Sequence, residues 1–482
     1  MQSRKVVLLE LNEITWDLID PLIAEGKLPT FARLKREGAV ASPMSVDEPP
    51  YLDPWITWTS VYSGTPQDQH KVAFLQQPPE TIKSKRIWEL LSEAGRKVGI
   101  YGSVCSWPAK PLDGYHVPDT FSQDYSTYPE SLEPIQRLNL TYTRSIRLPN
   151  DQDGLMFKAK LGSKLLGLGL RLGTGLKIAS QLISERLNPK IRWKRVCLQP
   201  LVNFDFFSKL YRKHRPDFAT FHSNHVAHFQ HTYWKMMQPD EFRPLETTQE
   251  DIETYGKAIE YGYQSADALI ASMLDLIDDD TVLVIASSMG QQPFRSSLKT
   301  GKRIGQLRSH DQLMEALGYG DRARAVAMMS DQFNVYAEDD LLTEVRAALD
   351  AVYIDTPDQP AFTTEAGSGA VTVTLKPWES TGPDSIIHFA GTPGEPKIVL
   401  DDLIYFSGLV KSGCHHPKGM MLMYGAGVKA GAEIADCNNL DIAPTLMALL
   451  GEPVPSVMTG RTLDEAFVEP LSAVREQETA VA

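Results

Sequence analysis

The sequence predicts an α/β protein with a mostly parallel central sheet that is covered by helices on both faces. Short apolar runs with strand character end in polar or small residues, and helical patterns lie between them. Several of these helical patterns stop at glycine, which is a common helix end. Strands that alternate with helices favour parallel pairing through crossover connections. With 482 residues and 42% hydrophobic residues, the chain can form a large packed core.

Five strands are expected along the chain. They cover residues 5–11, 97–104, 217–224, 281–288 and 419–427. Asn12 and Glu13 follow the first strand, and a group of histidines follows the third. Ligands in open α/β sheets bind outside the carboxyl ends of the strands. We therefore expect the functional site at these strand ends.

The helices expected between the strands share an amphipathic or apolar pattern of helical period. They cover residues 14–26, 28–38, 85–95, 255–277 and 440–451. The alternation of strands and helices holds in three parts of the chain, 1–124, 201–299 and 391–465, which we expect to form the core. Two segments between these parts break the alternation. Residues 300–390 resemble a small α+β insertion, and residues 466–482 are expected to form a flexible tail.

The other insertion, residues 125–200, is basic within an acidic chain. Residues 156–195 contain ten lysines and arginines against one acid, Glu185. This pattern fits amphipathic helices that cap the core with solvated charges. It also fits a lid that attracts an anionic substrate or contacts an anionic membrane surface peripherally.

Composition excludes several classes of function. The net charge of −13 disfavours nucleic-acid binding by the whole molecule. The four cysteines are widely spaced without a CxxC pair, which favours free thiols over disulfides or a thiolate zinc site. No signal peptide and no apolar run long enough to cross a bilayer are evident, so we expect a cytoplasmic protein.

Three stretches together resemble one protein family. They are "DLIDPLIAEGKLPTFARLKREGA" after the first strand, "PWITWTSVYSGTPQDQH" at 54–70, and the region 414–463 with "CHHPKG", "DIAPT" and "GEPVPSVMTGRTL". The chain is similar to the type I phosphodiesterase/nucleotide pyrophosphatase branch of the alkaline phosphatase superfamily. The resemblance covers roughly residues 1–120, 200–300 and 390–465 and implies an alkaline-phosphatase-like α/β/α sandwich. The two insertions do not match the family and interrupt this core. The resemblance also implies two divalent metal ions, commonly zinc, and a threonine or serine nucleophile at the strand ends.

This chain departs from the family pattern at several positions. Asn12 and Asn224 stand where the family has aspartates, and Ser287 and Ser288 replace an Asp-His pair. Pro54 lies near the position of the nucleophile. Asparagine and serine are weak zinc ligands, so the changes disfavour a two-zinc centre and favour one ion over two.

Replacement ligands are nevertheless available. The predicted metal ligands are Glu10, Asn12, Asn224, His228 and His416. His228 belongs to a group with His222, His225 and His231, and His416 is preceded by His415. A single divalent ion of undefined identity is one interpretation of these groups. The other is a metal-free site in which the histidines orient phosphate or act as acid and base.

The resemblance places the nucleophile near the stretch "LDPWITWT", residues 52–59. Thr57, Thr59 and Asp53 are its candidates, and Glu13 is a candidate base. The predicted function is hydrolysis or transfer at a phosphodiester, pyrophosphate or phosphomonoester of a phosphorylated small molecule. The alternative is a non-catalytic protein that binds a nucleotide or phosphosugar through a degraded metal site.

Overall fold

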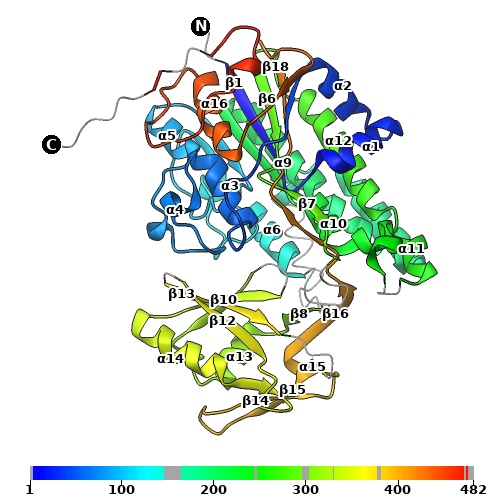
Figure 1. The fold of residues 1–482 in the computed structure, drawn as a ribbon, viewed down its shortest axis with the longest axis vertical. Helices are drawn as coiled ribbons and strands as arrows, with labels where there is room; N and C mark the ends of the chain where they lie inside the picture. Colours follow the sequence, from blue (N-terminus) through cyan, green and yellow to red (C-terminus); the bar gives the residue numbers. More distant parts are fainter. Residues whose placement is uncertain are drawn as a thin grey trace, which may run out of the picture.

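The computed structural model describes residues 4–145, 164–243, 247–295, 303–328, 331–367, 369–376, 381–471 and 474–475. Its largest part is a sandwich of helices around a central sheet, and a smaller lobe lies at one end of it (Figure 1). Part of the predicted basic insertion (146–163) and most of the predicted flexible tail lie outside the described residues.

The central sheet has eight strands in the order β19-β2-β18-β6-β1-β5-β3-β4. Their bounds are β1 Lys5–Leu11, β2 Ala39–Ala41, β3 Val98–Tyr101, β4 Gly114–Val117, β5 Phe218–Ser223, β6 Thr281–Ala286, β18 Met421–Gly425 and β19 Ala432–Ile434. The five strands from β6 to β4 pair in parallel, while β18 runs antiparallel to both β6 and β2. Parallel pairing brings the carboxyl ends of β1, β5, β3 and β6 to one edge.

Side chains of β1 alternate between two hydrophobic cores. Val7, Leu9 and Leu11 pack into one core, and Val6 and Leu8 pack into the other. This period of two is the expected geometry of a strand that is buried on both faces. By the same alternation, the side chain of Glu10 points to the side of the sheet on which Val6 and Leu8 pack.

Helices cover both faces of the sheet (Figure 1). The core that includes Val7 is closed by α1 Trp16–Ala24, α2 Pro29–Glu37, α9 Leu198–His214, α10 His225–Met237 and α12 Ala258–Leu274. The core that includes Val6 is closed by α3 Pro54–Ser63, α5 Ile87–Glu93 and α16 Ile442–Leu449. The predicted α/β/α sandwich with a mostly parallel sheet is thereby confirmed.

Helix α3 shows how local sequence sets these elements. Asp53 takes the N-cap position in an extended conformation, and Pro54 occupies the first helical position, where its missing N–H costs nothing. Gly64 ends the helix with φ of 63°, in the left-handed region that glycine adopts easily. The helix is completely buried, which explains its lack of a polar face.

Five further helical elements belong to this part of the chain. They are α4 Gln67–His70, α6 Glu133–Ser145, α8 Leu172–Leu187, α11 Gln249–Tyr255 and the 3-10 segment η3 Pro189–Cys197. Helices α6 and α8 fall within the basic insertion that the sequence indicates.

The smaller lobe has a hydrophobic core of its own. It contains β8 Arg303–Leu307, α13 His310–Ala316, β9 Arg324–Ala327, β10 Gln332–Tyr336, α14 Asp339–Asp350, β11 Val352–Ile354, β12 Phe362–Gly367, β13 Ala370–Leu375, β14 Ile386–Phe389, β15 Lys397–Val399, α15 Leu400–Leu403 and β16 Ile404–Val410. A cavity of about 490 Å³ lies between the lobe and the sandwich, lined by residues of both, among them Phe121 and Arg324.

A two-stranded ribbon leads the chain into and out of this lobe. Strand β7 (Gly290–Pro293) precedes it and pairs antiparallel with β17 (Gly413–His416), which follows it. The pairing sets His415 opposite Gln291 and His416 opposite Gly290. Because side chains alternate along a strand, the two adjacent histidines point to opposite faces of the ribbon.

Candidate active site

Glu13 turns away from the line of β1. It adopts φ of 60°, in the left-handed region that costs a residue with a side chain about 1 kcal/mol. The turn moves the Glu13 side chain out of strand register, toward α10, where Gln230 Nε2 donates to the Glu13 carbonyl at 2.9 Å. The Glu13 side chain is buried there.

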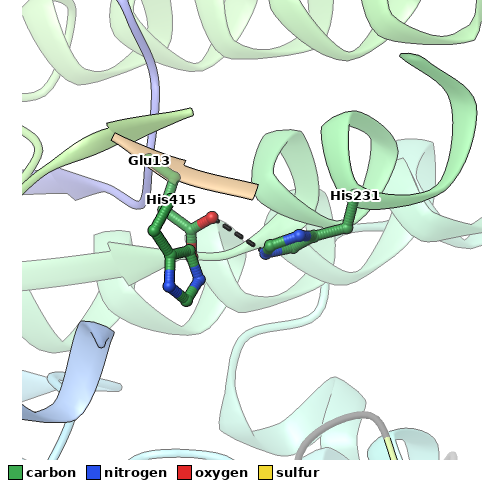
Figure 2. Close-up of side chains that lie close together, drawn as sticks. All are labelled: Glu13, His231 and His415. Carbon is green, nitrogen blue, oxygen red and sulfur yellow. Dashed lines mark ion pairs between the residues drawn. The ribbon is translucent and has the colours of Figure 1, made fainter. Parts of the chain in front are cut away.

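Glu13, His231 and His415 form a compact group (Figure 2). His231 Nε2 lies 2.9 Å from Glu13 Oε2, and His415 Nε2 lies 3.7 Å from Glu13 Oε1. One ligand atom from each residue falls within 4.8 Å of the others. The three residues come from the end of β1, from α10 and from β17, which are far apart in sequence.

The outer nitrogen of each imidazole is held by an acceptor. His231 Nδ1 lies 3.0 Å from the carbonyl oxygen of Gly413, and His415 Nδ1 lies 2.8 Å from that of Leu52. A carbonyl oxygen only accepts, so both Nδ1 atoms carry the proton and donate it. Each Nε2 is left facing Glu13. A lone pair there faces a carboxylate oxygen, and that contact needs a proton or a cation between the two atoms.

Burial and neighbouring charges shift the pKa values of these three residues in different directions. Burial raises the pKa of Glu13, but the two imidazoles and the hydrogen bonds from His231 and Gln291 outweigh burial and hold that pKa at about 2. Burial lowers the pKa of His231 despite the nearby carboxylate. For His415, burial also acts to lower the pKa, but Glu13 and Asp53 together raise it. The carboxylate is therefore ionised, as a metal ligand must be.

Amide side chains hold Glu13 in place. Asn12 Nδ2 donates to Glu13 Oε1 at 2.9 Å and to Asn224 Oδ1 at 2.7 Å, while Gln291 Nε2 donates to Glu13 Oε2. Trp58 Nε1 donates to Asn12 Oδ1 at 2.8 Å. The amide oxygens of Asn12 and Asn224 are thus already engaged, and both residues act here as hydrogen-bond partners of the group.

The candidate nucleophiles differ in their access to solvent. Thr59 is completely buried and donates to the Trp55 carbonyl oxygen at 2.7 Å. Thr57 is also completely buried, and its hydroxyl lies 2.7 Å from that of Ser288. The Asp53 side chain is 30% exposed and its Oδ1 lies 3.2 Å from His415 Nδ1. Asp53 is therefore the accessible group of the three.

Glu10 belongs to a separate buried group on the α3 side. It accepts from Tyr62 Oη at 2.8 Å and from Ser103 Oγ at 3.0 Å, and it lies 3.0 Å from His222 Nδ1. Burial raises the pKa of Tyr62 well above its usual value, and the Glu10 charge acts in the same direction. The structure thus places Glu10 and Glu13 on different sides of the end of β1.

His228 and His416 lie outside the three-residue group. Burial lowers the pKa of His228 to about 4, and its ring packs beside that of Phe229. His416 Nδ1 accepts from the Lys418 backbone N–H at 3.1 Å. Their assignment as metal ligands stays a prediction. Among the described residues, the group that could hold a metal contains their neighbours His231 and His415 in their place.

The donor set of this group fits a single divalent ion. Two imidazole nitrogens and one carboxylate are the ligands of many catalytic zinc sites, in which a fourth position stays open. In such sites the outer imidazole nitrogens usually donate to an acceptor, as those of His231 and His415 do here. An ion bound here would take the place of the proton that the raised pKa of His415 favours. Gln291, which contacts Glu13, carries no sequence signal that would have identified it; its position depends on ribbon pairing.

The sequence was compared with family patterns, with curated proteins and, through the structure, with solved structures. The sequence pattern of the type I phosphodiesterase / nucleotide pyrophosphatase family matches residues 6–366. No curated protein matches the chain in sequence. Among solved structures, murine ectonucleotide pyrophosphatase/phosphodiesterase 5 is similar over 93% of this chain and 95% of its own, at 11% identity and a TM-score of 0.41. An inactive form of that murine protein in complex with AMP gives the same coverage and identity, with a TM-score of 0.39.

Proposed function

Because the chain belongs to the type I phosphodiesterase / nucleotide pyrophosphatase family, we propose that it hydrolyses phosphodiester or pyrophosphate bonds of a phosphorylated small molecule. A single divalent cation is held by Glu13, His231 and His415. The observation that carries this proposal is the orientation of the two imidazoles, whose Nδ1 atoms donate to carbonyl oxygens while both Nε2 atoms face an ionised carboxylate.

A divalent cation at this position supplies a Lewis acid toward a phosphoryl oxygen and toward an attacking oxygen. The residues of the chain supply the rest. Asn12 and Gln291 hold the two oxygens of Glu13, so the ligand set is arranged before substrate arrives. Such support is worth about 10-fold to 100-fold in metal affinity or activity.

Asp53 is assigned the role of proton acceptor. Its side chain is 30% exposed, whereas Glu13 is 1% exposed and Glu10 is fully buried. It also lies beside His415, so a proton taken from an attacking water arrives next to the ligand group. Thr57 has the alternative role of nucleophile, which requires its hydroxyl to leave Ser288 and become exposed.

The test compares the wild-type protein, without a His-tag, with Glu13→Gln. We expect about one equivalent of divalent metal per wild-type chain by elemental analysis, and hydrolysis of a chromogenic aryl phosphodiester that stops after chelation and returns with added metal. Glu13→Gln keeps the shape but removes the charge, so metal content and turnover should both fall, turnover by at least about 100-fold.

Glu25→Gln is a matched control, because Glu25 is an exposed acid at the end of α1 whose partner is Lys27. This control should retain both metal and activity. Turnover that persists in the presence of chelator and in Glu13→Gln would contradict the proposal. Binding of phosphorylated compounds without turnover under any divalent metal would favour the non-catalytic alternative.

A further inference from the structure

Helix α8 turns its large apolar side chains toward solvent. Leu172, Leu176, Ile183 and Leu187 are 77%, 72%, 62% and 84% exposed. At 100° per residue these four positions fall within one narrow arc of the helix. They therefore form a continuous apolar stripe on the outside of the protein, which we call the α8 stripe. Single exposed apolar residues are ordinary, but a continuous stripe marks a binding surface.

The face of α8 that contacts the protein is polar. Thr174 and Glu185 are 5% and 6% exposed, and they lie opposite the stripe. Gln181 Nε2 donates to Glu185 Oε1 at 2.9 Å and to the Ile191 carbonyl oxygen at 3.2 Å. Glu185 also pairs with Arg195. A surface helix normally buries its apolar side and exposes its polar side, so α8 has the reverse orientation.

Aromatic packing under α8 fixes this orientation. Trp193 of η3 packs against the rings of Phe229, Tyr233 and Tyr261, at centroid distances of 5.9, 6.4 and 5.4 Å. Segment η3 thus supplies the apolar contact with the sandwich and offers α8 a polar surface. Upstream of the helix, the Arg171 backbone N–H donates to Asp205 Oδ2 at 2.9 Å. The helix is therefore attached on its polar side and at its start.

The segment that carries the α8 stripe is basic, although Arg171 and Lys190 in it pair with Asp205 and Glu250 of neighbouring helices. Residues 164–195 contain eight lysines and arginines, and their one acid, Glu185, is buried and paired. Lys177, Arg186 and Arg192 are exposed and have no acidic partner within the part of the chain that the structure describes. The chain as a whole carries −13, so this charge is local to the region around the stripe.

We call the exposed side chains of Lys177, Arg186 and Arg192 the basic border. We propose that the α8 stripe and this basic border bind the surface of an anionic lipid bilayer. Interfacial helices insert an apolar face to a depth of about 5–10 Å and place basic side chains at the headgroups. Helix α8 combines an exposed apolar stripe with the exposed basic side chains of Lys177 and Arg186. A second copy of the chain is a poorer occupant, because pairing two stripes would bring two basic borders together. None of the helices in the described part of the chain is long and apolar enough to cross a membrane, so the binding is peripheral.

The test is co-sedimentation of the full chain with vesicles. We expect binding to phosphatidylcholine vesicles that contain phosphatidylglycerol, weaker binding at high salt, and little binding to phosphatidylcholine alone. The double variant Leu176→Gln/Ile183→Gln should weaken binding by at least about tenfold because it removes apolar area from the stripe. Lys177→Gln, Arg186→Gln and Arg192→Gln should each weaken binding by about fivefold and reduce the salt dependence.

A matched control is Val457→Gln/Val468→Gln, which changes two valines that are 63% and 71% exposed elsewhere on the surface. This control should bind as the wild type does, and all variants should keep the wild-type melting temperature because the changed side chains are exposed. Wild-type protein that stays in the supernatant with anionic vesicles would overturn the proposal. So would equal binding by the stripe variant, or a stripe-dependent dimer that ignores vesicles.

Discussion

At the scale of single residues, the conformation of Glu13 decides the composition of the site. Strand alternation alone would leave residue 13 on the Leu11 side, in line with β1, and the sequence offers no glycine or asparagine there to indicate a left-handed residue. The sequence therefore identified Glu13 as a candidate without showing that its side chain would reach α10. The family pattern indicates His228, four residues after Asn224, whereas the group around Glu13 contains His231.

Variants of four histidines test which of them bind the metal ion. His231→Gln and His415→Gln should each lose bound metal, and kcat/KM should fall by about 100-fold or more, because one of three ligands is missing. His228→Gln and His416→Gln change the same residue type one helical turn or one residue away, outside the group. These two variants should retain metal. Measured metal content and kcat/KM for all four variants check this prediction.

The opposite pattern, with metal lost only from the His228 and His416 variants, would restore the ligand set expected from the family resemblance. Loss in all four variants with unchanged melting temperatures would indicate a larger site that includes both pairs. Metal content should be measured before activity, since a folding defect lowers both quantities while a missing ligand leaves the melting temperature of the metal-free protein unchanged.

At the scale of elements, the ion pairs of Glu89 at the start of α5 contribute to the stability of the folded protein. Glu89 accepts from the Arg86 backbone N–H at 3.0 Å, from Arg86 Nε at 2.9 Å and from Lys110 Nζ at 2.8 Å. Burial acts to raise the pKa of Glu89, but Arg86 and Lys110 outweigh it and lower that pKa to about 2. The ionised carboxylate therefore stabilises the start of the helix.

The sign of the pH effect follows from this lowered pKa. The stabilisation is complete above the usual glutamate pKa near 4.5 and is lost as the pH falls toward 2. Glu89→Gln should lower the free energy of unfolding at neutral pH by up to about 3 kcal/mol and should flatten its decline between these pH values. Urea unfolding at a series of pH values measures both effects.

Glu93→Gln is the control on the same helix, because Glu93 is 59% exposed and pairs with the equally exposed Lys85. Exposed pairs contribute little, so this variant should stay within about 1 kcal/mol of the wild type at every pH. An acid decline that is identical in Glu89→Gln and the wild type would show that other groups govern stability at low pH.

Elements were the part of the fold that the sequence predicted best. The strand expected at 281–288 is found as Thr281–Ala286, and the helix expected at 85–95 as Ile87–Glu93, because apolar period and glycine stops are local signals. The ribbon of β7 and β17 was not expected. Its strands are four residues each and about 120 residues apart in sequence, so their pairing depends on tertiary contacts that no local pattern encodes.

At the scale of the whole molecule, two bodies with separate cores share one chain. The core of the smaller lobe contains none of the residues that form the two cores of the sandwich. The two bodies nevertheless touch beside the cavity of about 490 Å³. Met328 of the lobe packs into a core of the sandwich. Asn334 Nδ2 donates to the Leu75 carbonyl oxygen at 2.7 Å, and Tyr336 Oη donates to that of Gln76 at 2.8 Å. Because each body has a hydrophobic core of its own, we expect them to unfold in separate transitions.

Calorimetry tests this division with two leucines on helices. Leu349→Ala in α14 changes a side chain that is completely buried in the core of the smaller lobe. Leu446→Ala in α16 changes a side chain that is 1% exposed in the core of the sandwich. Each should destabilise its own body by about 2–5 kcal/mol and shift one of two transitions. A single transition that both variants shift equally would show that the two bodies unfold as one.

The β7–β17 ribbon connects the smaller lobe to the group formed by Glu13, His231 and His415. Gln291 and His415 face each other across it, and each also approaches Glu13 from its own strand. A change in the orientation of the lobe would therefore be transmitted through β7 and β17 to two side chains that contact Glu13. We expect a ligand in the cavity between the two bodies to change the separation between His415 and the carboxylate, and with it the affinity for a cation.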